Sequence, residues 1–263
     1  MRALNGRYNN HQVDEENPYW ISFSDIMAGL LVVFVLAAVA LILELTQKSE
    51  QWDEAIREIA KAEQVRKDLL REIEHELNAM SIPVKISDND TVLRIPEDVL
   101  TFEQGHFDIS SDDRSQRIAL DIGKVLFASI TRDERWRYLD TIFVEGHTDR
   151  VPFRSRSIKG NWGLSTFRAI SVWNYWNESM DANARLDLLN NHVGKKLFSV
   201  SGYAETRPVP CSNAGSDVKD SAICPEGLLE EAESLRKNRR IDIRFTVRRP
   251  ALEDYQAVKQ VLD

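Results

Sequence analysis

The most apolar stretch of the chain lies near its start and runs from Trp20 to Leu45. Asp25 and Glu44 are the charged residues within it, and its turns offer no polar face that a soluble helix would present to water. About 20 apolar residues are enough to cross the hydrocarbon core of a bilayer as a helix. The pattern therefore predicts a transmembrane helix over residues 20–45, preceded by an N-terminal segment over residues 1–19.

Ala38 and Ala40 have the spacing of a signal-peptide cleavage site. The segment before the apolar run has only Arg2 and Arg7 as basic residues, however, and a carboxylate interrupts the region that should be purely apolar. The run also continues past Ala40 to Leu45. These features favour an uncleaved membrane anchor over a cleaved leader.

Residues 46–82 contain no Pro or Gly and are rich in good helix formers, and Pro83 follows them. Their apolar residues recur at spacings of three or four, with one gap at Ala62. These residues are Trp52, Ile56, Ile59, Val65, Leu69, Ile73, Leu77 and Met80. The pattern predicts a helical linker with a single apolar stripe. The stripe either packs on the chain's own downstream domain or pairs with the parallel helix of a second copy.

Beyond residue 83, short strand-like segments alternate with helix-like segments. The strand-like segments are 91–102, 139–147, 196–205 and 239–249, and the helix-like segments are 112–130, 161–180 and 227–238. In the last strand-like segment the positions expected to face inward are Ile241, Ile243, Phe245 and Val247. Such alternation predicts an α/β domain over residues 83–249, with helices packed on one sheet, and a tail over 250–263.

The net charge of −8 argues against a nucleic-acid partner, because binding to phosphates depends on clustered Lys and Arg. Two short basic clusters exist, at Arg236–Arg240 and Val247–Arg249. No aromatic platform accompanies them, so we interpret both as scattered surface charge.

The two cysteines, Cys211 and Cys224, lie in a loop-like stretch rich in Pro, Gly, Ser, Asn and Asp. Paired, they would close a loop of about 14 residues and stabilise the fold by roughly 3 kcal/mol in the chain-entropy model. Such a disulfide persists only in an oxidising compartment, and the alternative is two unrelated free thiols. The basic residues on the two sides of the span are too evenly matched to set its orientation. A disulfide would place the C-terminal domain in the periplasm and the N-terminus in the cytoplasm.

The candidate chemistry of the domain lies around the end of the strand-like segment 139–147. Asp149 follows that strand and Arg168 lies on the next helix, and an Asp–Arg pair can hold a zwitterion, the carboxylate binding an ammonium and the guanidinium a carboxylate. His147 has no serine with a matching partner beside it, so we interpret it as structural. No Cys–His metal spacing occurs. The sequence therefore predicts a protein without enzymatic activity, cofactor or metal.

Four motifs in order resemble the OmpA/MotB family of peptidoglycan-binding domains: HTD at 147–149, NWGLSTFRA at 161–169, SGYAETRP at 201–208 and NRRIDI at 238–243. The segment TFEQGHFDI at 101–109 also resembles that family's first strand. The resemblance covers roughly Val84 to Val247. It implies a sheet with helices on one face.

The resemblance also implies the site residues. Asp149 and Arg168 would grip the diaminopimelate of the peptide stem, with Thr148, Asn161 and Leu164 lining the groove. The chain departs from the family in a longer, more basic loop between Asp149 and Asn161 and in an apparent insertion between the two cysteines.

This resemblance suggests a function for Asp25, because a charge inside a membrane helix is costly and usually marks a functional site. The stretch from Trp20 to Leu30 is similar to the membrane helix of flagellar stator B subunits, and most similar to that of Zorya anti-phage B subunits. A carboxylate in low-dielectric surroundings can be protonated near neutral pH, so Asp25 would carry an ion across the membrane. Ser22 and Ser24 either line the route of the ion or serve the helix as caps.

A single span cannot enclose a channel, and small residues at Ala28 and Gly29 would let a neighbouring helix approach. The resemblance therefore implies a multi-span A subunit, five copies around two copies of this chain, and peptidoglycan as a further partner. The resulting expectation is the B subunit of a proton-driven motor in anti-phage defence. The alternatives are a flagellar-type stator subunit and a passive wall anchor.

Overall fold

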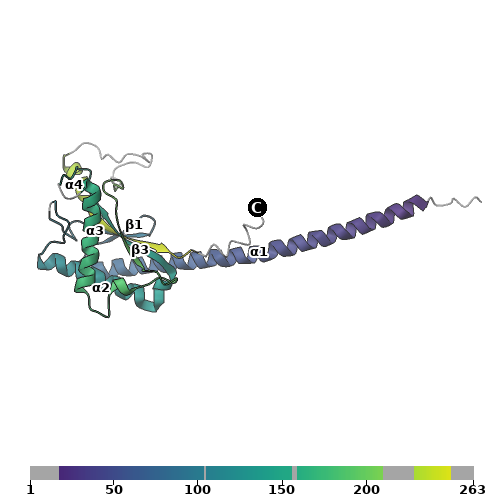
Figure 1. The fold of residues 1–263 in the computed structure, drawn as a ribbon, viewed down its shortest axis with the longest axis horizontal. Helices are drawn as coiled ribbons and strands as arrows, with labels where there is room; N and C mark the ends of the chain where they lie inside the picture. Colours follow the sequence, from purple (N-terminus) through teal and green to yellow (C-terminus); the bar gives the residue numbers. More distant parts are fainter. Residues whose placement is uncertain (1–17, 104, 156–158, 210–227, 250–263) are drawn as a thin grey trace, which may run out of the picture. The chain divides into compact units, whose positions relative to one another are not determined.

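The computed structural model describes residues 18–103, 105–155, 159–209 and 228–249. Its elements, drawn in Figure 1, are α1 (Pro18–Ala79), β1 (Lys85–Ser87), β2 (Val92–Pro96), α2 (Asp113–Thr131), η1 (Arg132–Tyr138), β3 (Leu139–His147), α3 (Gly160–Ser179), η2 (Leu186–Leu188), β4 (Phe198–Gly202), α4 (Leu228–Asn238) and β5 (Arg240–Val247). A long apolar helix followed by an α/β domain is the fold class that the sequence predicts, and the structure confirms it.

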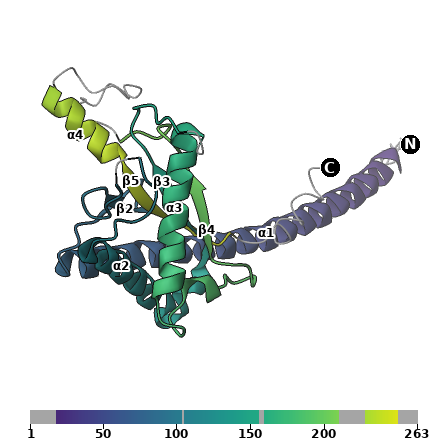
Figure 2. The same ribbon diagram turned by 60° about the vertical axis from the view of Figure 1, so that its left-hand side comes forward.

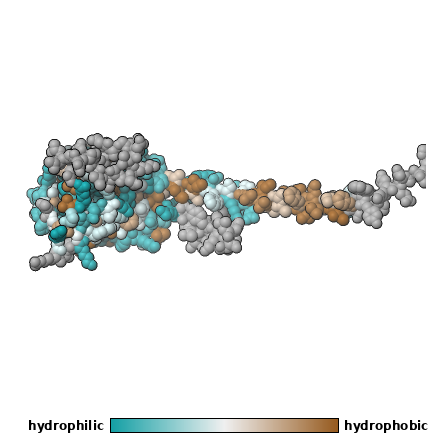
Figure 3. Space-filling model, turned by 90° about the horizontal axis from the view of Figure 1, so that it is seen from above, coloured by the Kyte–Doolittle hydropathy of each residue, from teal (hydrophilic) through white to brown (hydrophobic). Residues whose placement is uncertain are grey.

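The N-terminal part of α1 has the length and apolar composition needed to cross a membrane. None of its most apolar 18-residue window is buried against the described parts of the chain, and hydrophobic residues predominate on the side of it that Figure 3 shows. The described residues up to Ala55 form one compact unit, and those from Ile56 onward form a second. Helix α1 is continuous from the predicted span into the predicted linker and ends at Ala79. No Pro or Gly interrupts the chain between the two segments.

The last turns of α1 are part of the domain core. Leu69, Ile73 and Leu77 are fully buried, and so is Ala62, where the apolar stripe has its gap. Ala62 is small enough to let the helix lie close to its neighbours. For this half of the stripe, packing on the chain's own domain is the correct interpretation.

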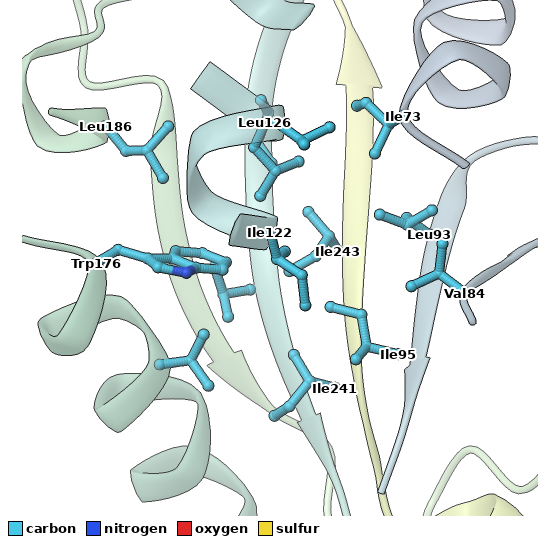
Figure 4. Close-up of a cluster of buried hydrophobic side chains, with 14 of the residues drawn as sticks. Ile73, Val84, Leu93, Ile95, Ile122, Leu126, Trp176, Leu186, Ile241 and Ile243 are labelled. Atoms are coloured by element: carbon cyan, nitrogen blue, oxygen red, sulfur yellow. The ribbon is translucent and has the colours of Figure 1, made fainter. Parts of the chain in front are cut away.

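The sheet has five strands in the order β1-β2-β5-β3-β4. Strands β3 and β4 are parallel, whereas the other neighbouring pairs are antiparallel. Figure 2 shows α2 and α3 lying against the sheet. The end of α1 together with α2 and α3 contributes the apolar side chains that meet one face of this sheet, and several of them are drawn in Figure 4. The core contains Leu93, Ile95, Ile122, Leu126, Ile142, Val144, Trp176, Ile241, Ile243 and Phe245.

The expectation for the segment 101–109 needs correction. The segment 101–109 was expected to form the first strand, but it contains only an isolated bridge between Phe102 and Ile109, and Gly105 lies in a turn with φ of 76°. The domain begins instead with β1 and β2. Strand β2 stops at Pro96 because proline has no N–H to donate to the ladder.

Candidate functional site

The end of β3 lies unusually close to the N-terminal half of α3. A Cβ atom on Gly146 would lie 1.9 Å from the backbone oxygen of Ser165, and one on Gly202 would lie 2.2 Å from Oγ1 of Thr166. Only glycine permits this approach. It brings the loop after β3 beside the face of α3 that carries the predicted site residues.

Strand register brings the end of β2 and the start of β5 to the same end of the sheet as the end of β3. Arg240 is paired with Pro96 at the end of β2 and with His147 at the end of β3. Since β5 is antiparallel to both neighbours, the residue before β5 lies near the residues that follow β2 and β3. Arg239 therefore meets Glu97 and Asp149, although these residues are far apart in the sequence.

Asp149 forms an ion pair with Arg239. Its Oδ2 accepts a hydrogen bond from Nη1 of Arg239 at 2.6 Å, and its Oδ1 accepts one from the backbone nitrogen of Val151 at 2.9 Å. Nε of Arg239 donates to Oε2 of Glu97 at 2.6 Å. Burial acts to lower the pKa of Arg239, but its bonds to Asp149 and Glu97 prevail and raise it. Arg239 is thus held as a cation between two carboxylates.

Arg168 is held in a different way. The residue is 4% exposed, its guanidinium lies over the ring of Phe102 with 4.9 Å between the guanidinium carbon and the ring centroid, and its Nε donates to the backbone oxygen of His106 at 3.1 Å. Burial lowers the pKa of Arg168, while Glu97 and Asp149 oppose that shift. The two acids are therefore close enough to influence Arg168 electrostatically. In the part of the chain that the structure describes, however, Asp149 bonds to Arg239 and not to Arg168.

Asn161 holds the loop after β3 in shape. Its Oδ1 accepts a hydrogen bond from the backbone nitrogen of Phe153 at 2.9 Å, and its Nδ2 donates to the backbone oxygens of Asp149 at 3.3 Å and Val151 at 3.1 Å. Both ends of the amide are thereby used within the protein. Asn161 thus positions the loop that carries Asp149.

Thr148 and Leu164, the remaining predicted site residues of the domain, are 4% and 6% exposed. The backbone nitrogen of Thr148 donates to the backbone oxygen of Ala204 at 3.0 Å, and its buried hydroxyl has no hydrogen-bond partner among the described residues. The structure therefore places both side chains inside the fold, with little surface of their own to offer a ligand.

Sequence reasoning missed Glu97, Arg239 and Phe102. Interpreting the cluster Arg236–Arg240 as scattered surface charge was wrong for its last two members, since Arg239 joins Glu97 and Asp149, and Arg240 is 6% exposed and bonded to Asp242. The available signal was the NRRIDI motif itself. It places two arginines at the start of an apolar strand, where a purely solvated pair would be unusual.

Residues 101–220 match the family model described as the OmpA family. This part of the chain is similar to OmpA domains, and we refer to the α/β domain below as the OmpA domain. It is 25% identical over 173 residues to Motility protein B of Bacillus subtilis, covering 66% of this chain and 49% of that protein. It is 24% identical over 140 residues to Zorya protein ZorB of Escherichia coli O139:H28, covering 52% of this chain and 53% of that protein. The chain thus spans about half the length of the curated relatives it matches, and it is similar to both of them.

Solved structures similar to the chain include a MotB-like protein from Desulfovibrio vulgaris, with 17% identity and a TM-score of 0.46 over 74% of this chain and 99% of that one. Another is the periplasmic domain of Helicobacter pylori MotB, with 22% identity and a TM-score of 0.41 over 68% and 88% of the two chains.

The other face of the OmpA domain's sheet carries a buried polar cluster, which we call the back-face cluster: Glu145, His147 and Asp242. Nε2 of His147 lies 3.5 Å from Oδ2 of Asp242 and 3.9 Å from Oε2 of Glu145. Burial, aided by Arg240, lowers the pKa of His147 to about 3, so the ring is neutral and these contacts are not ion pairs. Burial raises the pKa of Glu145, with Arg244 opposing the rise. His147 lies inside the fold and stacks on Tyr203, as a structural histidine would.

The remaining predicted site residues lie outside the OmpA domain or outside the described residues. Asp25 and Ser24 are exposed on α1, and the side chain of Ser22 lies outside the described part. Cys211 and Cys224 also lie outside it, so their pairing stays a prediction. The described residues contain no cluster of His, Cys, Asp and Glu suited to a metal ion.

Proposed function

We propose that this chain is the B subunit of an ion-driven motor in the bacterial inner membrane, anchored to peptidoglycan by its OmpA domain. The observation that carries this proposal is the combination, in one chain, of a carboxylate within an apolar span and a charged site at the end of β3. The likeness to Motility protein B and to Zorya protein ZorB supports it. The span would cross the membrane once, with the N-terminus in the cytoplasm and the domain in the periplasm.

The site at the end of β3 suits a zwitterion such as the free arm of diaminopimelate. Arg168 is fixed by the ring of Phe102 and by one bond from its Nε, which leaves its terminal nitrogens to bind the ligand carboxylate as a fork. Asp149 would accept the ligand ammonium. Asn161 would keep the carboxylate of Asp149 in place through the loop backbone. Thr148 and Leu164, which are buried, would support the site from inside the fold.

Asp25 would carry the ion. One charge that crosses 100 mV releases about 2.3 kcal/mol, enough to drive a local rearrangement of helices. Since one span cannot enclose a route for ions, a multi-span A subunit is required, and we propose five copies of it around two copies of this chain. A Cβ atom added to Gly29 would meet no atom of this chain within 4 Å, so a neighbouring helix could lie against it.

We propose anti-phage defence as the purpose of this motor, since the stretch from Trp20 to Leu30 resembles that of Zorya B subunits. A flagellar-type stator is the second candidate. The longer match to Motility protein B, 173 residues against 140 for Zorya protein ZorB, favours that second candidate. The presence of helicase or nuclease genes, rather than flagellar genes, beside the coding sequence would favour defence.

Wall binding is tested by sedimenting the full chain, in detergent micelles, with purified peptidoglycan sacculi. The proposal expects Arg168→Gln to reduce binding by about tenfold or more, because a buried guanidinium provides the carboxylate contact. Free meso-diaminopimelate should compete with the sacculi. The matched control is Arg185→Gln, since Arg185 pairs with Asp187 away from the site. Equal binding by both variants would contradict the proposed role of Arg168.

Ion coupling is tested by phage protection in cells that carry the whole operon. Asp25→Asn should abolish protection at matched membrane expression, because an amide cannot take up and release a proton. Glu44→Gln is the matched control, since Glu44 also lies in the apolar run and pairs with Lys48 at 3.0 Å. Protection retained by Asp25→Asn would reduce the chain to a passive anchor. No protection even from the unaltered operon would favour the flagellar-type stator.

A further inference from the structure

The carboxylate that should receive the ligand ammonium is already occupied by a cation of the protein itself. Oδ2 of Asp149 is bonded to Arg239 at 2.6 Å, and the side chain of Asp149 is only 12% exposed. An incoming ammonium must therefore take this place from Arg239. This replacement of Arg239 by the ligand ammonium rests on the proposed zwitterion site. It concerns which group pairs with Asp149 when no ligand is bound.

Arg239 has a second partner that can hold it after such an exchange. Its Nε donates to Glu97 at 2.6 Å, independently of the Nη1 that bonds to Asp149. Its side chain is 30% exposed, so the guanidinium can turn toward solvent while the bond to Glu97 remains. The residues on either side are fixed, because Asn238 bonds to the backbone of Val209 and Arg240 bonds to Asp242. Only the side chain of Arg239 needs to move.

Arg168 does not share this arrangement. It is 4% exposed, stacked on Phe102 and bonded to the backbone of His106 through Nε. Two arginines thus lie near the same pair of acids, one buried and fixed, the other partly exposed and held by carboxylates. The fixed arginine suits a permanent contact with the ligand, and the other suits an exchangeable one.

We propose that Arg239 is a resident counter-ion of Asp149 that the ligand ammonium displaces, and that Glu97 retains Arg239 when this happens. The charges of Glu97, Asp149, Arg168 and Arg239 sum to zero. A ligand that brings one ammonium and one carboxylate keeps that sum unchanged. A ligand with carboxylates alone leaves Arg239 on Asp149 and adds uncompensated negative charge. Arg239 and Glu97 thereby select ligands that carry both groups.

A supporting role for Arg239 in ligand binding predicts the opposite effect of removing its charge. If Arg239 only aligned Asp149 for the ligand, or bound the ligand itself, removing its charge would weaken binding. If Arg239 competes with the ligand, removing its charge strengthens binding. A variant that folds poorly cannot produce the second result.

The test is isothermal titration of the full chain, in detergent micelles, with meso-diaminopimelate and with pimelate, which lacks both ammonium groups. Arg239→Gln should bind meso-diaminopimelate about threefold to tenfold more tightly, because the competing charge is removed. The same variant should bind pimelate more weakly, because a positive charge is lost. Glu97→Gln should weaken the binding of meso-diaminopimelate, since Arg239 then stays on Asp149, without weakening that of pimelate.

Two controls separate competition from a general change of charge. Lys237→Gln removes a positive charge two residues away, on a side chain that is 50% exposed and paired with Glu233, and should leave both affinities within about twofold. Arg239→Lys keeps a competing cation and should not show the tighter binding. If Arg239→Gln does not fold, Glu97→Gln and Arg239→Lys carry the test.

The outcomes distinguish this proposal from the one on which it rests. If the unaltered chain binds neither meso-diaminopimelate nor sacculi, the zwitterion site itself is wrong, and the exchange with it. If the unaltered chain binds and Arg239→Gln binds equally well or more weakly, the exchange is wrong and the site stands. Tighter binding that appears equally for pimelate would also overturn the exchange.

Discussion

At the scale of single residues, the back-face cluster puts charged and titratable groups where a strand pattern predicts solvent. Asp242 and Glu145 are fully buried, on the sheet face opposite the helices. Arg94 and Arg244 lie over them, with bonds of 3.1 Å from Arg94 to Asp242 and 2.9 Å from Arg244 to Glu145. The acids are thereby paired, whereas neither ring nitrogen of His147 has a hydrogen-bond partner.

We predict that His147→Phe flattens the dependence of stability on pH. The pKa of His147 falls from an ordinary 6.5 to about 3 in the fold, so below pH 6.5 the unfolded chain binds a proton that the folded chain does not. Stability is lost as the pH falls through this window, by about 2 kcal/mol between pH 7.5 and pH 5. Phenylalanine keeps the stacking on Tyr203 and removes the titration.

The measurement is urea unfolding of both proteins, in micelles, at pH 7.5 and pH 5. The variant should match or exceed the unaltered protein at pH 7.5, and its advantage should grow at pH 5. An equal loss of stability in the two proteins would show that His147 is not the titrating group. Glu145 has a raised pKa in the fold, so its titration increases stability as the pH falls, opposite to the effect of His147. Glu145 is present in both proteins and does not account for a difference between them.

The candidate site could be predicted in part from the sequence. Asp149 and Arg168 were found because they flank a strand end and the next helix. Arg239 and Glu97 were not, because their meeting depends on β5 lying between β2 and β3, and the sequence does not state the order of strands. Asn161 was placed at the site, but its hydrogen bonds to the loop backbone depend on a loop conformation that has no periodic signal.

At the scale of elements, the position of α3 depends on two glycines. Gly146 and Gly202 let the helix backbone lie against β3 and β4, and the face of α3 so buried includes Asn161, Ser165 and Arg168. Oγ of Ser165 accepts a hydrogen bond from the backbone nitrogen of Ala204 at 3.0 Å, which ties the helix to the chain after β4. Phe167 lies on another face of α3 and is 41% exposed, with its ring centroid 5.4 Å from that of Phe107.

We predict that Gly146→Ala destabilises the domain by about 1–3 kcal/mol or more, because the added methyl group would collide with the backbone of Ser165 and force α3 away from β3. Binding to sacculi should fall together with stability, since α3 carries Arg168. Thermal unfolding of the full chain in micelles measures the first effect. Gly29→Ala is the control, because its Cβ would meet no atom of this chain. An unchanged melting temperature for Gly146→Ala would contradict this account of the close contact.

The helices α2 and α3 and the main strands could be predicted from hydrophobic periodicity because each contributes residues to the core. Strand β3 was placed correctly at residues 139–147, and the segment 112–130 forms α2, with Ile122 and Leu126 fully buried. The short strand β1 was missed, and the segment 101–109 was wrongly expected to be a strand. In both places the side chains alternate too briefly to reveal whether the backbone pairs with a neighbour.

At the scale of the whole molecule, α1 changes character along its length. Leu69, Ile73 and Leu77 are fully buried in the domain, whereas Trp52 and Ile56 are 50% and 58% exposed. Packing on the chain's own domain accounts for the buried residues of the stripe. It leaves Trp52 and Ile56 exposed and able to contact another helix. The expected second copy would therefore meet this chain along the earlier part of the stripe.

We predict that Ile56→Cys forms disulfide-linked dimers in oxidised membranes, in a chain whose Cys211 and Cys224 are replaced by serine. A parallel pair of helices brings equal positions of two copies together, whereas Leu69→Cys should not crosslink because Leu69 is buried. Arg57→Cys, exposed but on a different side of the helix, is the second control. Crosslinking of Ile56→Cys and Arg57→Cys to the same extent would indicate random collision and would contradict the helix pair.

The central place of β5 in the sheet also constrains how the chain is made. Strands β2 and β3 share no pairing with each other, and both pair with β5, the last strand of the described residues. Until β5 has been synthesised, β1-β2 and β3-β4 are two separate pairs of strands, each with an unsatisfied edge. The five-stranded sheet therefore cannot be completed until β5 has been made, so its formation depends on contacts between strands that lie far apart in the sequence.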